Sequence, residues 1–462
     1  IKEWKTLQKL SDEEDHALLE HRMRTTPVEG PAYALQVAVP EDMDFIFKVP
    51  EKSVLSNGVT VLYIHNAVVQ KIDIILSFAA REYEDPFDKQ GLYRFLCEVV
   101  LEGTTTYPGN LFAQKVEEYG MTLSCQPGSI TLTCLKEDFK DGLMFLVDLL
   151  VNAELSDASI EKIRHHILSD LKVYWDEPQE FCHQLIRQSV YKDHPYAKDP
   201  QGTMSGVNAI TKDDIKRFYE YAFASEHASL AIVGDLAGYD VVKEVEAAFK
   251  AWRRSWKSVT LYPVLAPVEP LEIAYTINRD QVVLAFAGIS ITRLDPDYEK
   301  LLLFDHIFSG GSSGSMSSRL MRIREQTGLF YGIGGSLIVG CNEQPGMVVV
   351  RTTVSLDRLE EAKDVIQHTI VTVINSLTEE ELTQAKHTII NGLIDNFSSN
   401  KKIAGSYLGV QRFGLPLDYF KTFKDRIAAI SLEEVQQAAA KILILEKMIM
   451  LKIGRALDDQ AG

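Results

Sequence analysis

The spacing of apolar residues along the chain follows two periods, and each period predicts one kind of element. Short apolar or alternating runs predict strands, whereas apolar residues three and four positions apart predict helices. Asn57-Gly58 lies between two apolar runs and favours a tight hairpin turn across 53–66. The other predicted strands are 71–78, 121–125 and 130–135, and the predicted helices are 91–102, 111–119, 139–150 and 156–174. This order of strands and long helices predicts an α+β fold, in which helices cover a mixed, mainly antiparallel sheet.

Two stretches of the chain recur at nearly the same offset. Leu155–Leu171 (LSDASIEKIRHHILSDL) is similar to Leu377–Leu393 (LTEEELTQAKHTIINGL) at an offset of 222 residues. Ala209–Val233 is similar to Ala429–Ile453 at an offset of 220, and each is predicted as a capped helix leading into an apolar strand. Chance similarity of amphipathic helices is the alternative, but two matches at nearly one offset favour a repeat. A period of this length predicts two related domains in tandem rather than a solenoid.

The predicted domains are 49–255 and 271–458. Residues 256–270 read as a linker rich in proline, and residues 1–48 as a polar leader or linker segment. The chain starts at Ile1 without the features of a signal peptide, so we expect a processed or excised piece. No apolar run is long enough for a transmembrane helix.

Acidic residues outnumber basic ones, 65 against 48, and the formal net charge is −17. This excess argues against nucleic acid as a main partner. It would suit a basic peptide, although solubility alone is the simpler interpretation.

The five cysteines form no C-x-x-C pair, so neither a disulfide framework nor a cysteine zinc site is indicated. We expect free and partly buried thiols in a soluble protein. This fits a reducing compartment without excluding a periplasm, so the localisation stays open. The cysteines are Cys97, Cys125, Cys134, Cys182 and Cys341.

One helix carries a family motif. Glu82–Thr104 (EYEDPFDKQGLYRFLCEVVLEGT) resembles the active-site helix of the inverted-motif zinc peptidases, the pitrilysin/insulinase family. That helix reads approximately G-x-x-H-F-L-E-H, followed shortly by G-T. The residues that fit this frame are Gly91, Phe95, Leu96, Gly103 and Thr104.

Three further segments resemble the family in the family's order: His194–Ile215, Ala228–Asp235 and Asp295–Tyr331, the last containing SGGSSGSMSSRLMRIREQTGLFY. The resemblance extends over roughly residues 50–455. It implies that the two domains form half of a clamshell around a peptide-sized chamber.

The family's zinc motif is degenerate in this chain. Two histidines at i and i+4 reach one zinc, and the Glu between them is the general base. Here the first His position is Arg94, the base position is Cys97 and the second His position is Glu98. The third-ligand position falls at Asp170, with Ser169 as the competing alignment. Arg offers no lone pair to a metal, so the resemblance implies neither a metal site nor a catalytic residue in this chain.

His166 and Asp170 are four residues apart on one predicted helix, and Glu98 could face them. A rebuilt metal site is therefore one alternative, although only one histidine would be well placed. The simpler interpretation is that His165 and His166 are surface residues. Our hypothesis is that Arg94 forms an ion pair with Glu98 or Asp170 at the former metal position, and the alternative is a solvated Arg94.

Arg324 and Tyr331 match an Arg and a Tyr that, in catalytic relatives, reach from the late domain to the zinc site. The resemblance implies that they hold substrate backbone and the developing oxyanion. The alternative is a surface helix charge at Arg324 and a core aromatic at Tyr331.

These features together predict a non-catalytic half or subunit of a zinc metallopeptidase. It would complete the peptide-binding chamber of a zinc-bearing homologous partner, either a separate subunit or the other half of a longer polypeptide. The alternatives are a structural scaffold subunit without a peptidase role, and an enzyme with a rearranged site.

Overall fold

The computed structural model describes residues 45–257, 262–265, 268–277, 281–311 and 314–455. Residues 1–44 of the predicted leader or linker lie outside the described residues. So do residues 258–261 and 266–267 of the predicted linker at 256–270. Residues 45–462 form one compact unit by their internal contacts. No described helix is both long enough and apolar enough to cross a membrane.

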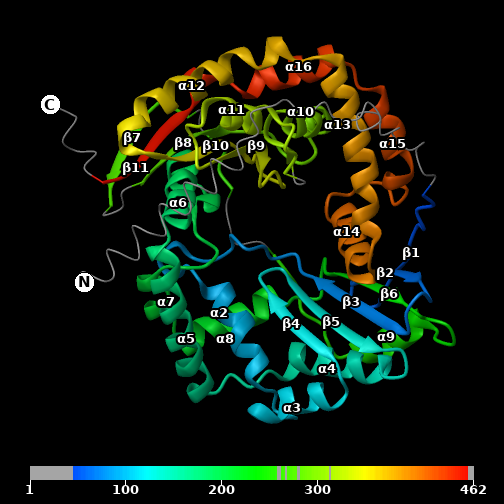
Figure 1. Ribbon diagram of the computed structural model, residues 1–462. Helices are drawn as coiled ribbons and strands as arrows, with labels where there is room; N and C mark the ends of the chain where they lie inside the picture. The colour runs from blue at the N-terminus through cyan, green and yellow to red at the C-terminus, as the bar shows by residue number, and fades with distance from the viewer. Residues whose placement is uncertain (1–44, 258–261, 266–267, 278–280, 312–313, 456–462) are drawn as a thin grey trace, which may run out of the picture. The chain divides into compact units, whose positions relative to one another are not determined.

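The first sheet has six strands in the order β1-β2-β6-β3-β5-β4 (Figure 1). Only β2 and β6 pair in parallel, and the other neighbours are antiparallel. The strands are β1 (Glu51–Val54), β2 (Thr60–His65), β3 (Lys71–Ser77), β4 (Thr122–Gln126), β5 (Ser129–Leu135) and β6 (Ser229–Gly234).

One face of this sheet packs on helices from the same part of the chain. Alternate residues of β3, including Ile72 and Ile74, enter a core with Leu96 of α2 and Leu146 of α4. The helices are α2 (Leu92–Val99), α3 (Asn110–Glu118), α4 (Phe139–Asn152), α5 (Asp157–Asp176), α6 (Pro178–Tyr191), α7 (Met204–Ala209), α8 (Lys212–Ala222) and α9 (Val241–Phe249).

The second sheet has five strands in the order β7-β11-β8-β10-β9. They are β7 (Glu272–Thr276), β8 (Gln281–Ile289), β9 (Gly332–Val339), β10 (Met347–Ser355) and β11 (Ile449–Gly454). Its accompanying helices are α10 (Tyr298–Ser309), α11 (Arg319–Thr327), α12 (Leu359–Thr372), α13 (Glu379–Gly392), α14 (Asn400–Arg412), α15 (Tyr419–Ala429) and α16 (Leu432–Ile442).

The predicted repeat is confirmed by matching elements. The N-cap residues are Thr211 for α8 and Ser431 for α16, and each forms a capping box with an acid three residues later. Each helix leads into a strand with the same pairing: β6 is parallel to β2 and antiparallel to β3, and β11 is parallel to β7 and antiparallel to β8. The α+β fold with two related mixed sheets is therefore as predicted.

The second face of the first sheet is covered by a helix from the other repeat. Leu62, Ile64, Ala231 and Val233 point away from the first core and are buried in a cluster with residues of α14. α14 lies against β3 and β6 (Figure 1). Asn66 donates a hydrogen bond to Asn400 over 2.8 Å at the helix start. The β2 and β6 strands are therefore buried on both faces.

Candidate functional site

The start of α2 is fixed by a buried carboxylate. Asp85 accepts hydrogen bonds from the amides of Gly91, at 2.7 Å, and Tyr93, at 2.9 Å. Burial raises the pKa of Asp85 to about 6, although these two amides oppose the shift. Gly91 has a φ of 100°, and a Cβ there would lie 3.0 Å from the Cα of Gly202. The helix with the degenerate motif is thus held firmly at its first turn.

Arg94 forms the expected ion pairs, with both candidate acids. Its Nε lies 2.8 Å from Oε1 of Glu98, and its Nη2 lies 2.7 Å from Oδ2 of Asp170. Nη1 also donates to the side-chain oxygen of Gln201, at 3.2 Å. The Arg94 side chain is only 17% exposed, so the alternative of a solvated Arg94 is wrong. Ser169, the competing alignment, is exposed.

His166 joins the same cluster from α5. Its Nδ1 lies 3.2 Å from Oε2 of Glu98 and 3.8 Å from Oδ2 of Asp170. The imidazole is largely exposed, at 62%. Each carboxylate therefore faces both a guanidinium and an imidazole.

The residues of this cluster do not fit a zinc ion. Glu98 and Asp170 are the two carboxylates present, and both are bound to the guanidinium of Arg94. A metal placed between them would meet a fixed positive charge that has no lone pair to offer. Among the described residues, no group of three or more His, Cys, Asp or Glu side chains could hold a metal ion.

Cys97, at the position of the general base, faces the core. It is 2% exposed, and burial raises its pKa well above the usual range, with the neighbouring thiol of Cys125 adding to the shift. A neutral thiol buried in this way is neither a base for water nor an active nucleophile.

Arg324 and Tyr331 lie next to each other, at the end of α11 and the start of β9. Nε of Arg324 donates to the carbonyl oxygen of Tyr331 over 3.1 Å. The Tyr331 residue is 81% exposed, so the alternative of a core aromatic is wrong. In the described part of the chain, no hydrogen bond or ion pair joins these two residues to the Arg94 cluster. Their role in substrate binding stays a prediction.

Two other features near the motif were not predicted from the sequence. Gln201 contacts Arg94 from more than a hundred residues away in sequence. The strand β4, which contacts α2, is the last in its sheet and pairs only with β5 among the described strands. Such an edge offers backbone N–H and C=O groups to an added strand.

Comparisons with known proteins find matches over both repeats. The chain matches the family described as "Insulinase (Peptidase family M16)" over residues 60–203 and that described as "Peptidase M16 inactive domain" over residues 209–389. A Rickettsia bellii protein named "Uncharacterized zinc protease" is 26% identical over 351 residues, which are 74% of this chain and 82% of that protein. The Helicobacter pylori "Non-peptidase homolog YmxG" is 22% identical over 82% of this chain and 87% of its own length.

Two solved structures have the same fold. The peptidase M16 inactive domain from Pseudomonas fluorescens has a TM-score of 0.80 at 22% identity and covers 88% of this chain and 98% of its own. The periplasmic protease PqqL from Escherichia coli has a TM-score of 0.71 at 13% identity, and the match covers 90% of this chain but 48% of PqqL. This chain therefore corresponds to about half of PqqL. Both repeats carry the family's sequence and fold, and the chain belongs to the insulinase family of peptidases, M16.

Proposed function

We propose that this chain is a non-catalytic half or subunit of a zinc metallopeptidase. One observation carries the proposal: Arg94 is bound to Glu98 and Asp170 at the place of the family's zinc ligands. A zinc ion supplies an activated water and a Lewis acid, and an arginine supplies neither. The description of one relative as a non-peptidase homologue supports the same conclusion.

The proposed role is to complete the peptide-binding chamber of a zinc-bearing homologous half, in which the zinc is expected. Two features of this chain support peptide binding. The edge of β4 lies beside α2 and could pair with an extended peptide. Tyr331 is exposed, and Arg324 lies against its backbone. The match to about half of PqqL supports a second half, in the same polypeptide or a separate one.

The test uses the chain assembled with a zinc-bearing homologue from the same cell. The isolated chain should contain no stoichiometric zinc by elemental analysis and should not cleave a quenched peptide. In the assembly, Arg324→Ala or Tyr331→Phe should lower kcat by about 10²–10³, which is typical for loss of one oxyanion donor. The loss should fall on kcat because the contact strengthens as charge develops on the carbonyl oxygen.

Arg322→Ala is the matched control, because Arg322 lies on the same helix but pairs with Glu381. It should leave kcat unchanged, and sizing should show intact assembly for all variants. If kcat is unchanged in both Arg324→Ala and Tyr331→Phe while the complex is intact, the proposed role in the peptide-binding chamber is wrong. The result would then favour the scaffold function. One equivalent of zinc in the isolated chain, with cleavage that depends on it, would favour the rearranged enzyme.

A further inference from the structure

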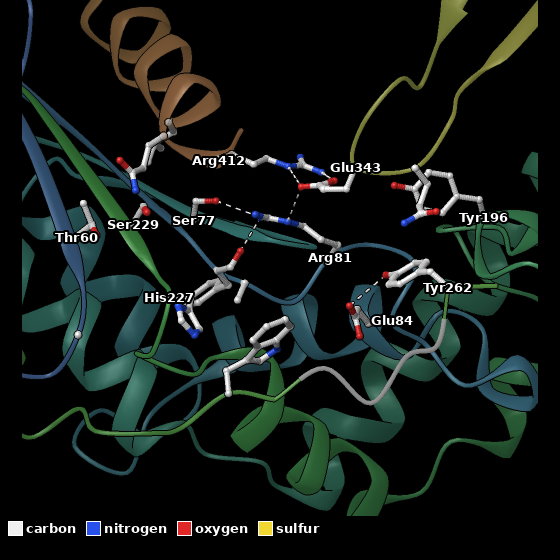
Figure 2. Close-up of a pocket in the computed structure, with 17 residues that line it drawn as sticks. Thr60, Ser77, Arg81, Glu84, Tyr196, His227, Ser229, Tyr262, Glu343 and Arg412 are labelled. Atoms are coloured by element: carbon white, nitrogen blue, oxygen red, sulfur yellow. Dashed lines mark hydrogen bonds and ion pairs between the residues drawn. The ribbon is translucent and has the colours of Figure 1, made fainter. Parts of the chain in front are cut away.

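A second polar site lies apart from the degenerate motif. It is a cavity of about 650 Å³ between the end of β3, the end of α14 and the turn that precedes β10 (Figure 2). This volume is in the range of small-ligand sites. Its walls combine charged and aromatic side chains, among them Arg81, Arg412, Glu343, Tyr196, Trp256 and Tyr262.

Arg81 reaches into this cavity, and its hydrogen bonds go to uncharged acceptors. Its side chain is 24% exposed. Nη1 donates to the carbonyl oxygen of Phe78 over 2.5 Å and to the hydroxyl of Ser77 over 3.4 Å, and both acceptors are uncharged. The ion pair of Arg81 with Glu343 is long, because Oε1 of Glu343 is 3.9 Å from Nε, beyond hydrogen-bond range. The charge of Arg81 is therefore only weakly matched.

Glu343 is already engaged by a second arginine. Nε and Nη2 of Arg412 each lie 2.7 Å from one oxygen of Glu343, which is a bidentate pair. Among the residues that line this end of the cavity, one carboxylate thus faces two guanidinium groups. Burial lowers the pKa of Arg81 and the charge of Arg412 lowers it further, while the charges of Glu343 and Glu82 oppose the shift.

The opposite wall carries a buried acid, Glu84. Glu84 accepts hydrogen bonds from the hydroxyls of Tyr221 and Tyr262. Figure 2 shows Glu84 beside Tyr262 and away from the Arg81–Glu343–Arg412 group. The positive end of the cavity is thus separate from its negative end, and aromatic rings lie near both.

We propose that this cavity binds the carboxylate of a peptide, either an acidic side chain or a C-terminus, with an apolar or aromatic residue beside it. The guanidinium of Arg81, whose ion pair with Glu343 is longer than a hydrogen bond, would receive the carboxylate, and Trp256 and Tyr262 would contact the neighbouring side chain. The choice of a peptide rests on the proposed function, whereas the choice of a carboxylate rests on the charges of the cavity.

The test uses the full chain alone and isothermal titration with three synthetic peptides. The first is acetyl-Ala-Phe-Glu-Ala-amide, the second has Gln in place of Glu, and the third is acetyl-Ala-Phe-Ala-Ala with a free C-terminus. We expect at least one carboxylate peptide to bind about 10–100-fold more tightly than the Gln peptide, the usual effect of a charge-assisted hydrogen bond. The Glu peptide identifies a side-chain carboxylate, and the third peptide identifies a C-terminus. Equal binding by all three, or binding by none, would overturn the proposal.

Arg81→Met should remove the preference for the carboxylate peptide and lower the affinity for that peptide by a similar factor, because Met keeps the apolar stem but not the charge. Arg322→Met removes the same charge outside the cavity and should have no effect. Thermal unfolding verifies that each variant is folded. If Arg81→Met does not fold, the comparison of the Glu and Gln peptides on the unsubstituted chain tests the proposal. No catalytic partner is present, so these results are independent of the kcat test of the proposed function.

Discussion

At the scale of single residues, Arg94 replaces a metal ion by a charge that belongs to the chain. Glu98 and Asp170 would repel each other without it, and both are partly buried, at 26% and 45% side-chain exposure. Partly buried ion pairs lie between exposed pairs, which contribute little, and buried pairs, which are costly to break. The contribution of Arg94 to stability should therefore be intermediate.

Arg94→Met should lower the free energy of unfolding by about 1–3 kcal/mol, because two carboxylates lose a charged donor while the apolar stem remains. Urea denaturation measures the change. Arg358→Met, which breaks an exposed pair with Glu361 on the surface, is the control and should cost less than about 0.5 kcal/mol. Equal effects of the two substitutions would show that the Arg94 cluster is not structurally important.

At the scale of elements, a buried acid joins α10 to the edge strand β9. Oδ1 of Asp305 accepts the amide of Leu337 over 2.7 Å, and Oδ2 accepts the hydroxyl of Ser336 over 3.2 Å. Asp305 is 4% exposed, and burial raises its pKa to about 6 despite these donors. The fold therefore favours the neutral acid at this position.

Because the pKa of Asp305 is higher in the folded chain, its protonation stabilises the fold. This stabilisation is fully present below the pKa of the unfolded chain, near 4, and is lost as pH rises through the folded pKa of about 6. Asp305→Asn keeps one acceptor for Leu337 and cannot ionise. The stability of the variant relative to the original chain should therefore rise by about 2–3 kcal/mol between pH 4 and pH 7. Chemical denaturation at several pH values measures this difference.

Asp364→Asn makes the same change at an exposed position of α12 and serves as the control. A difference between Asp305→Asn and the original chain that does not vary with pH would show that Asp305 is not held neutral by the fold.

The elements of each repeat could be predicted from local patterns, because periodicity and capping residues are properties of neighbouring positions. The hairpin at Asn57-Gly58 and the capping residues Thr211 and Ser431 are examples. Burial on both faces of β2 could not be predicted, since Leu62 meets a helix from the other repeat. The cavity was missed for the same reason, because Arg81 and Arg412 are far apart in sequence. The ion pairs of Arg94 were predictable only through the family motif.

At the scale of the whole described unit, the two repeats share a core. Leu62, Ile64, Ala231 and Val233 are each no more than 6% exposed, and they lie in the cluster that includes α14. Burial of four such side chains contributes about 6–10 kcal/mol as an upper estimate. The boundaries at 49–255 and 271–458 stay a prediction, and we expect the two parts to fold together.

Cleavage at a protease site introduced within 262–265 should leave both fragments associated, because the apolar contact with α14 does not depend on the connection. Size-exclusion chromatography should show co-elution. Residues 45–257 produced alone should bind a hydrophobic dye through the uncovered face of the first sheet. Separate elution of two folded fragments would contradict the shared core.

The ion pairs of Arg94 also make the folding of this chain independent of the metal supply. A zinc site gains stability only when the free metal concentration exceeds its dissociation constant. The guanidinium of Arg94 is covalently part of the chain, so its ion pairs with the two carboxylates do not depend on the metal concentration. A cell starved of zinc would therefore still produce this chain in its folded form, and the shortage would act only on a partner that carries the metal.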